Sequence, residues 1–458
     1  MTLVEEMAEF VSSSSYDRLS KAAVLQLKIR VLDAIGCAIG ALSSDPVAKI
    51  RALQESFGGS RQCTLVGGRK TSPERAALYN GALVRYLDFN DSFLAKAETC
   101  HPSDNVAPVL AASEYAGASG SDFLTALAVA YQVQCRLSEV APVRAKGFDH
   151  TTHGAYAVAA GAARALSLGP AETANAIAIS GTALNALRVT RTGRLSNWKG
   201  LAYPFVSFGG MMAVFIAAKG ITGPLEVFEG NKGFMDSVAG KFEIDWRRED
   251  LEVVTRTIVK RYNAEVHSQS SIECMLALKS ESGFRVEDIK SVELRIFDVA
   301  YNIIGGGEEG DKKLVETKEQ ADHSLPYILA AALLDGQVMP RQYSPRRIAR
   351  DDVQSLLRKI DVHPDEQLSS RFPKAMPCRI TVRLNDGRSL EKSADDYEGF
   401  FTRPMGWERV AEKFHGLASS HASLSLRTKI EDAVKHLDRL EIRDLANLLG
   451  RVGRTKRS

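Results

Sequence analysis

Long apolar runs that are rich in alanine and glycine fill the first two thirds of this 458-residue chain, and they constrain its fold more than any other feature. These runs occupy residues 105–116, 121–138, 154–167 and 170–187, and Gly, Pro or a capping residue bounds each of them. The segment Ala22–Leu42 spaces its Leu, Ile and Val residues as a helix does. Because the runs lack the alternation of strands, and because small side chains let helices approach closely, the sequence predicts a packed helical domain.

The pattern changes near residue 288. Val292–Ile296 and Cys378–Leu384 alternate apolar and polar residues, as half-buried strands do, and Asn385–Gly387 is a strong hairpin-turn signal. Helical pattern returns in Ser324–Leu334, in Ser344–Lys359 and from Trp407 onward. The sequence therefore predicts a mainly α fold. A large all-helical domain is built from residues 1–269 and 405–458, and a smaller α+β domain occupies residues 270–404.

The composition is typical of a soluble globular protein with a substantial core, since 45% of the residues are hydrophobic, 25% are charged and the net charge is +3. The six cysteines form no CxxC pair, so neither a zinc ribbon nor a redox dithiol is indicated, and their low density fits a reducing compartment. The first ten residues are acidic where a secretory signal would be basic. These features predict a cytoplasmic protein.

Two segments raise the question of a membrane or a nucleic acid. Residues 200–218 carry no charge, but Gly200 and Pro204 interrupt their start, which favours a buried core helix over a membrane span. The basic C-terminal end is interpreted as a solvated terminus rather than a nucleic-acid-binding arm. Its cations are Arg451, Arg454, Lys456 and Arg457. We therefore expect neither a membrane nor a nucleic acid as a partner.

Carboxylates and a histidine gather in the segments Asp88–Ser92 and His101–Asn105. Asp88 and Asp91 lie three residues apart and would share a helix face. A carboxylate beside a histidine can divide acid and base roles, because their surroundings can push the two pKa values apart. The structural alternative is an Asx-turn followed by a helix that Asp104 caps.

A second cluster, Asp149-His150-Thr151-Thr152-His153, places two histidines three residues apart next to an acid. It has three interpretations: a metal site, a histidine that binds substrate or transfers a proton, and a helix-capping turn. The spacing is not HExxH and no third ligand is evident, so a metal is the least favoured of the three.

A third cluster, within Asn185–Gly200, contains four cations and no acid: Arg188, Arg191, Arg194 and Lys199. Arginine forks match carboxylates in a two-pronged way. The alternatives are an anion-binding segment and a solvated basic loop. With one aromatic residue and apolar surroundings, a nucleic-acid surface is disfavoured. Two further polar segments, Glu265–Gln269 and Asp322–Tyr327, are ordinary turns when taken alone.

Several cofactor and nucleophile motifs are missing from the chain. It contains no GxGxxG after a strand, no GxxxxGK[ST] and no GxSxG. A nucleotide cofactor, a P-loop and an α/β-hydrolase nucleophile are therefore unsupported.

Taken in their order along the chain, these segments resemble the MmgE/PrpD family, which includes 2-methylcitrate dehydratase, cis-aconitate decarboxylase and an iminodisuccinate epimerase. The matching segments are YLDFNDS, HPSDN, GFDHTTHGAYA, NALRVTRTG, NWKG, ITGP, GF, YNAEVHSQSSIE, KEQADHSLPY and DYEGFFTRPMGWERVAEKF. No single segment is decisive, but their shared order covers nearly the whole chain. The segments DHTTH, NWKG and ADHSLPY are most similar to the 2-methylcitrate dehydratase branch.

The resemblance implies an all-helical domain from both chain ends, an α+β lid domain, a homodimer and a set of site residues. The family's active-site Asp matches Asp88, its HP histidine His101, its lysine Lys199 and its lid tyrosine Tyr327. Ser92 stands where the family has Thr, and Asn90 replaces an acid. The second family histidine matches either His150 or His153, and the histidine near the lid hinge most nearly matches His267.

We interpret the chain as a lyase that dehydrates 2-methylcitrate to 2-methyl-aconitate without metal or cofactor. Lys199, with Arg188 and Arg191, would neutralise the carboxylate charge that builds up as a neighbouring carbon proton leaves. Asp88 and His101 would share the acid–base work in either order, with His150 as a further catalytic group. Tyr327 would orient the substrate or assist proton transfer as a catalytic group, and Ser92, His153 and His267 would bind the substrate.

Two alternatives remain. The first is another reaction of the family, decarboxylation of cis-aconitate or epimerisation of iminodisuccinate, on a small tricarboxylate or dicarboxylate. The second is a helical scaffold without catalytic activity.

Overall fold

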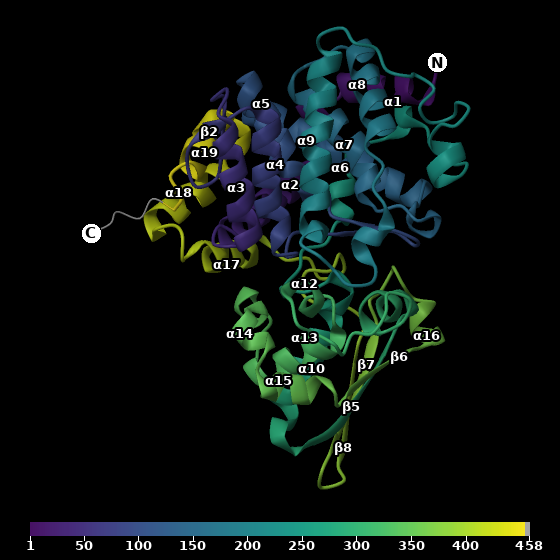
Figure 1. Cartoon of the computed structure of the whole chain (residues 1–458), viewed down its shortest axis with the longest axis vertical. Coiled ribbons are helices and arrows are strands. Elements are labelled where there is room, and N and C mark those ends of the chain that lie inside the picture. The colour runs from purple at the N-terminus through teal and green to yellow at the C-terminus, as the bar shows by residue number, and fades with distance from the viewer. Residues whose placement is uncertain (454–458) are drawn as a thin grey trace. The chain divides into compact units, whose positions relative to one another are not determined.

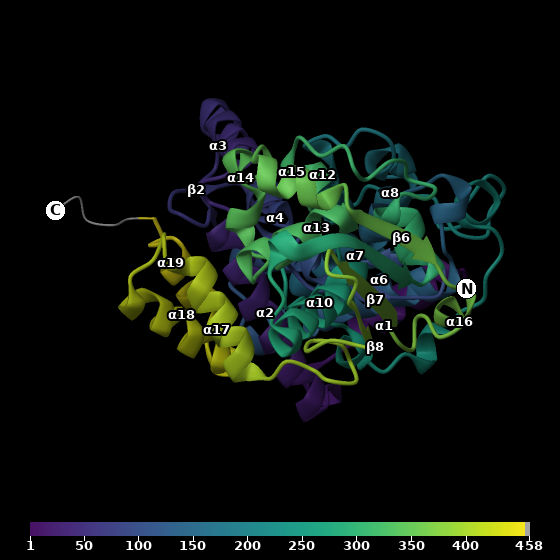
Figure 2. The same cartoon turned by 90° about the horizontal axis from the view of Figure 1, so that it is seen from below.

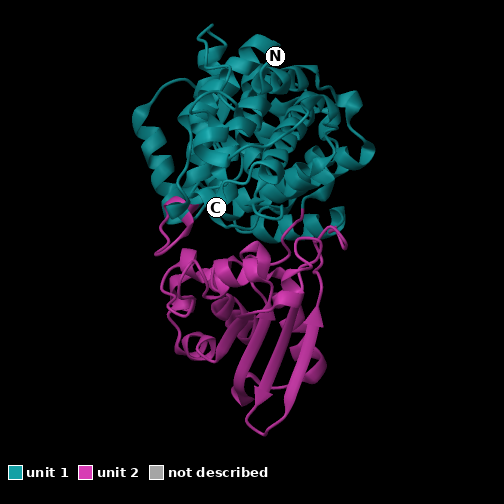
Figure 3. Cartoon of the chain, turned by 90° about the vertical axis from the view of Figure 1, so that its right-hand side faces the viewer, with its two compact units in different colours: residues 1–190, 200–257, 406–458 teal, residues 191–199, 258–405 magenta. Residues whose placement is uncertain are grey.

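The computed structural model describes residues 1–453 and is mainly α-helical (Figure 1). The chain forms two compact units (Figure 3). Unit 1 comprises residues 1–190, 200–257 and 406–458, and unit 2 comprises residues 191–199 and 258–405. Of the cations in the predicted solvated terminus, Arg454, Lys456 and Arg457 lie outside the described residues.

The first boundary between the units falls after residue 257, twelve residues before the predicted one at 269–270. Backbone hydrogen bonds explain the difference, because they tie residues 258–269 to the rest of unit 2. The amide of Val259 donates to the carbonyl of Gly399 over 3.1 Å, and that of Glu265 donates to Asp322 over 3.0 Å. These partners lie far along the chain, so no local pattern marks the boundary.

Unit 1 is a helical assembly drawn from both ends of the chain. Its helices are α1 (Leu3–Ser13), α2 (Lys21–Gly40), α3 (Asp45–Phe57), α4 (Pro73–Tyr86), α5 (Val106–Ala116), α6 (Gly120–Val140), α7 (Thr151–Ala165), α8 (Pro170–Ala183), α9 (Trp198–Ala217), α17 (Trp407–Ala418), α18 (Leu424–Lys435) and α19 (Ile442–Leu449). Two short hairpins, β1 (Cys63–Thr64) with β2 (Lys70–Thr71) and β3 (Phe93–Leu94) with β4 (Thr99–Cys100), connect them. The first two residues of α9 belong to unit 2.

Small residues set the helix spacing in unit 1, as the alanine-rich and glycine-rich runs predict. A Cβ at Gly161 would lie 2.8 Å from the Cβ of Ala130, and one at Gly154 would lie 2.5 Å from the ring of Tyr203. Larger side chains at these two positions would force the helices apart.

The C-terminal helices α17, α18 and α19 lie together in unit 1 (Figure 2), and α17 packs on α2. The Cα of Phe414 would be 3.1 Å from a Cβ at Gly36. One turn away, the ammonium of Lys413 lies 2.7 Å from the carboxylate of Asp33 and donates to the carbonyl oxygen of Phe89 over 2.7 Å. Through Lys413, helix α17 therefore fixes the position of the segment that follows α4.

Helix α9 is long and apolar enough to cross a membrane by length and composition alone. In the structure, 56% of its most apolar window is buried. It packs with Gly210 against Val158 of α7, where a Cβ would lie 2.8 Å from that side chain. A helix buried in this way is expected in the core of a globular unit, as the sequence predicts.

Unit 2 contains a four-stranded sheet in the order β6-β5-β7-β8. Its strands are β5 (Ile289–Ile296), β6 (Ile360–Pro364), β7 (Cys378–Leu384) and β8 (Ser389–Ala394). Its helices are α10 (Gln269–Ser282), α11 (Asp298–Ala300), α12 (Lys318–Ala321), α13 (Leu325–Asp335), α14 (Pro345–Ile348), α15 (Asp351–Leu357) and α16 (Glu366–Ser369). Helices α10 and α13 pack against the sheet, which runs parallel only between β5 and β6.

The predicted strands β5 and β7 and the hairpin into β8 are confirmed. The predicted helix Ser344–Lys359 is instead two helices, because α14 ends at Ile348 and Arg350 has an extended backbone before α15 begins. Strand β6 is an edge strand that the sequence did not predict.

Candidate functional site

Asp88 lies just beyond the end of α4, in a backbone conformation that residues other than glycine rarely adopt. Its φ is +54°, and it is 3% exposed. Its amide donates to the carbonyl of Arg85 over 3.0 Å, and Arg85 Nη1 donates to its carboxylate over 2.6 Å. Non-glycine residues in the left-handed region persist where their surroundings over-determine them, and functional sites are enriched in them.

Asn90 joins the two predicted acid–base segments. Its amide nitrogen donates to Ser103 Oγ over 3.0 Å and to Asp104 Oδ1 over 2.8 Å. Its carbonyl oxygen accepts from Arg85 over 3.3 Å. The amide can donate and accept at once, whereas a carboxylate at this position would face Asp104 with like charge. The replacement of the family's acid by Asn90 thus suits the local hydrogen bonds.

The ring of His101 is held through one nitrogen. Its Nδ1 lies 2.9 Å from the carbonyl oxygen of Asp91 and 3.0 Å from Ser92 Oγ. A carbonyl oxygen only accepts, so Nδ1 carries the proton of the neutral ring, and Nε2 is then the nitrogen with the lone pair. This arrangement gives Ser92 and the backbone of Asp91 a clear role: they set the tautomer of His101.

Asp91, which the sequence pattern pairs with Asp88 but does not assign a role, fixes this loop to the core through its side chain. It is fully buried, accepts from the backbone of Ser103 over 2.9 Å and from the hydroxyl of Tyr131 over 2.9 Å, and lies 3.8 Å from Arg30. Burial raises the pKa of Asp91 in spite of the nearby Arg30 guanidinium. Its spacing from Asp88 is visible in the sequence, but its burial is not.

His150 lies beside His101, with ring centroids 5.4 Å apart in an edge-to-face arrangement. Its Nδ1 is 3.5 Å from the buried carboxylate of Asp149, and Arg188 Nη1 is 3.7 Å from the other oxygen of that carboxylate. Unit 1 therefore brings together Asp88, Ser92, His101, His150 and Arg188, which we call the unit 1 cluster.

His153 has different surroundings, inside helix α7. It is fully buried, its Nε2 lies 2.8 Å from the carbonyl oxygen of Ala141, and its ring is 6.4 Å from that of Phe234. Burial lowers its pKa to about 4. Its Nε2 is engaged by a carbonyl oxygen, so it is not offered to a metal together with His150.

Lys199 lies in unit 2, where it meets the acid that its own segment lacks. Lys199 is 3% exposed, and its ammonium lies 2.9 Å from the carboxylate of Asp322 and 2.9 Å from Nδ1 of His323. Lys318 contacts the other oxygen of Asp322 over 2.6 Å. Burial raises the pKa of Asp322, but the ammonium groups of Lys199 and Lys318 outweigh it and hold the pKa well below its usual value.

A carboxylate–histidine pair adjoins this group. His267 Nδ1 lies 2.7 Å from Glu265 Oε1, and its backbone amide donates to Glu265 Oε2 over 2.8 Å. Burial raises the pKa of Glu265, but His267 outweighs it and lowers the pKa to about 2. The hydrogen bond from Glu265 N to Asp322 O places this pair next to Lys199.

Tyr327 and Arg191 are the remaining predicted site residues that lie in unit 2. Tyr327 is fully buried in α13, and its hydroxyl donates to the carbonyl oxygen of Gln342. Burial raises its pKa. Arg191 is 5% exposed and ends a short 3-10 turn (Arg188–Arg191). We call Lys199, Lys318, Asp322, His323, Glu265 and His267 the unit 2 cluster.

The sequence pattern did not identify two buried lysines of unit 2 as candidate site residues. Lys260 is fully buried and Lys312 is 8% exposed. Lysines are ordinarily solvated, and only burial in the fold distinguishes these two from the others.

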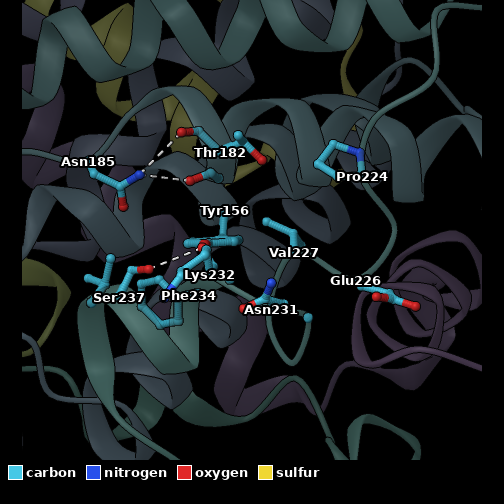
Figure 4. A pocket seen from close by; sticks show the side chains of 14 residues that line it. Tyr156, Thr182, Asn185, Pro224, Glu226, Val227, Asn231, Lys232, Phe234 and Ser237 are labelled. Carbon is cyan, nitrogen blue, oxygen red and sulfur yellow. Dashed lines mark hydrogen bonds between the residues drawn. The ribbon is translucent and has the colours of Figure 1, made fainter.

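A separate cavity of 420 Å³ lies in unit 1 (Figure 4). Tyr156 and Phe234 line it with ring centroids 5.2 Å apart, and Asn185 Nδ2 donates to the carbonyl of Thr182 over 3.3 Å at its edge. No predicted site residue lines this cavity. This cavity therefore belongs to neither of the two polar clusters.

Proton-transferring enzymes use buried acids, histidines and lysines. Unit 1 contains buried acids and histidines, and unit 2 contains buried lysines with a carboxylate–histidine pair. Two family models match the chain: the MmgE/PrpD N-terminal domain over residues 5–247 and the MmgE/PrpD C-terminal domain over residues 262–439. The chain belongs to the MmgE/PrpD family.

Relatives of this chain include proteins named for two lyase activities. A cis-aconitate decarboxylase of Mus musculus is 25% identical over 98% of this chain and 93% of that relative. A 2-methylcitrate dehydratase of Escherichia coli (strain K12) is 26% identical over 84% of this chain and 83% of that relative. A 2-methylcitrate dehydratase of Cupriavidus necator is 27% identical over 83% of this chain and 81% of that relative.

Proposed function

We propose that this protein is a lyase that dehydrates 2-methylcitrate by acid–base elimination. The reaction removes a proton from a carbon next to a carboxylate and expels a hydroxyl from the neighbouring carbon as water. It needs a base, an acid and cations that stabilise the carboxylate as charge builds up on it. In this proposal Asp88 and His101 are the acid–base groups and Lys199 is the cation, and neither a metal nor a nucleotide takes part.

The observation that carries the proposal is the fixed tautomer of His101. With Nδ1 bound to the carbonyl of Asp91, Nε2 is the nitrogen that can take up a proton. Asp88, held by Arg85 in a strained conformation, is the second proton-handling group. One of the two takes the carbon proton and the other protonates the leaving hydroxyl.

Of the two candidate histidines, we assign His150 to the reaction. Its ring lies against His101 and its Nδ1 is near Asp149, whereas the Nε2 of His153 is bound to a backbone carbonyl in the core. His153 then acts through the packing of α7 and not through contact with substrate.

Lys199 is assigned to the developing carboxylate charge. Asp322 also contacts the ammonium of Lys318, so two cationic side chains lie at one buried carboxylate. A preorganised charge of this kind, in surroundings that exclude water, stabilises an anionic transition state more than bulk water does.

A second candidate reaction is the decarboxylation of cis-aconitate. The decarboxylase of Mus musculus matches 98% of this chain, compared with 84% for the dehydratase of Escherichia coli, at similar identity. Decarboxylation would use the same proton-handling groups to protonate the carbon that loses carbon dioxide.

The test is turnover of purified, chelator-treated protein on 2-methylcitrate, citrate, cis-aconitate and iminodisuccinate, followed by NMR. The proposal expects 2-methyl-aconitate from 2-methylcitrate, and a loss of about 10² to 10⁴ in kcat for His101→Asn. His436→Asn, an exposed histidine in unit 1, serves as the matched control and should keep full activity. Itaconate from cis-aconitate, with no reaction of 2-methylcitrate, would replace the first candidate by the second.

We also propose that the protein forms a homodimer through α9. That helix exposes Phe205, Met212 and Ile216 at helical spacing, with exposed fractions of 49%, 39% and 37%. Residues spaced by three, four or seven positions share one face of a helix, and an apolar face of this kind is commonly covered by a partner.

A further inference from the structure

Lys312 is a buried lysine beside the unit 2 cluster. It is 8% exposed, and its backbone carbonyl accepts a hydrogen bond from Ser324 Oγ over 2.5 Å. Ser324 directly follows His323, the residue whose ring lies 2.9 Å from the ammonium of Lys199. The hydrogen bond therefore anchors Lys312 next to the residues that hold Lys199.

The ammonium of Lys312 lacks a fixed counterion. Across residues 1–453, no carboxylate oxygen lies within 4.0 Å of it and no hydrogen bond engages it. Burial lowers the pKa of Lys312, Glu309 acts in the opposite direction, Lys199 lowers the pKa further, and Glu265 and Asp311 raise it. A buried charge without a partner is costly, so such a residue in a native protein needs an explanation.

The lysines near Lys312 in the chain form ion pairs with acids. Lys318 contacts Asp322, and Lys313, the next residue in the chain, contacts Asp361 over 2.7 Å at the surface. Glu265, the acid of the unit 2 cluster that acts electrostatically on Lys312, is already engaged, because both of its carboxylate oxygens accept from His267. Lys312 differs from both lysines, because it is buried and forms no ion pair within 4.0 Å among the described residues.

We propose that Lys312 binds a carboxylate of the substrate, a different one from that which Lys199 stabilises. The site then selects acids that carry at least two carboxylates, and Lys312 contributes to binding more than to the chemical step. This inference rests on the proposed function, and it specifies which residue recognises the part of the substrate that does not react.

The experiment compares Lys312→Met, Lys312→Arg and the matched control Lys313→Met. Calorimetry measures the binding of tricarballylate, an unreactive tricarboxylate, and of butyrate, a monocarboxylate. A charged hydrogen bond of this kind corresponds to about a 10-fold to 100-fold loss of affinity. We expect that loss for tricarballylate in Lys312→Met, little change for butyrate, and recovery of most of the affinity in Lys312→Arg. Lys313→Met should bind both as the wild type does.

Thermal unfolding of the unliganded variants supplies a second readout. Removing a buried charge without a counterion should leave the Tm of Lys312→Met equal to or above that of the wild type. A fall in its Tm, with tricarballylate affinity unchanged, would make Lys312 a structural residue and overturn the proposal.

The two proposals fail in different ways. If the wild type dehydrates 2-methylcitrate and Lys312→Met binds tricarballylate as tightly as the wild type, the assignment of Lys312 is wrong and the proposed function stands. If the wild type turns over none of the four acids but binds tricarballylate in a Lys312-dependent manner, the assignment stands and the proposed function is wrong.

Discussion

Substituting the two lysines that share Asp322 separates a catalytic charge from a structural one. Lys199 and Lys318 contact different oxygens of that carboxylate, over 2.9 and 2.6 Å, and their side chains are 3% and 14% exposed. Replacing either by Met leaves Asp322 with the other ammonium and with His323 at 2.8 Å. Removing one partner of a buried pair costs about 3–5 kcal/mol when the remaining charge is uncompensated. Here it is compensated, so we expect about 1–3 kcal/mol for each variant.

Activity should separate the two variants. Lys199→Met should lower kcat by about 10² to 10⁴, the effect of losing one preorganised stabiliser of developing charge, whereas Lys318→Met should keep kcat within about 10-fold. Urea unfolding followed by circular dichroism gives the stability of each variant, and turnover is measured where both are fully folded. If the two variants lose the same stability and keep the same kcat, Lys199 is a structural residue and its assignment to the substrate is refuted.

Three further predictions concern other parts of the molecule. His150→Asn should reduce kcat by about 10²-fold or more with little change in stability. His153→Asn should lower stability by about 1–2 kcal/mol and leave kcat of the folded enzyme nearly unchanged. Denaturation curves and kinetics of both variants check these expectations. The folded-state pKa of Glu265 is about 2 against the ordinary 4.5, so its stabilisation is complete above pH 4.5 and is lost as the pH falls towards 2. Wild-type stability, measured by urea unfolding between pH 6 and 3, should therefore decline by about 2 kcal/mol more than that of Glu265→Gln. Phe205→Lys should shift the protein from dimer to monomer in sedimentation experiments, and an unchanged mass would show that this face of α9 is not the interface.

Local patterns predicted the elements whose cause is local. The alternation of Val292–Ile296 and Cys378–Leu384 identified β5 and β7, because side chains in a strand point alternately to its two faces. Strand β6 is five residues long, ends in a proline and follows directly on a helical pattern, so its alternation is too brief to stand out. Its pairing with β5 depends on residues about seventy positions away.

Site residues, too, were predictable from the sequence only where their neighbours in the structure are also near in the chain. Asp88 and His101 lie near each other in sequence and share one loop system, so their spacing indicated a common function. The pairing of Lys199 with Asp322 joins residues 123 positions apart, which no spacing argument reaches. Lys312 had no signal at all, since a lysine in a polar loop is typical of a solvated surface and only tertiary packing buries it.

The hydrogen bond from Lys413 to the carbonyl of Phe89 has a consequence for synthesis of the chain. It spans 324 residues, and the same ammonium lies 3.7 Å above the centre of the Phe89 ring, directly beside Asp88. At about 5–20 residues per second, a ribosome needs roughly 15 to 65 seconds to make the intervening length. Residues 258–405 leave the ribosome before α17 does, so they can fold while the turn at Asp88 still lacks its clamp. A nascent chain halted before α17 should therefore hold an ordered sheet and an unfinished acid–base loop.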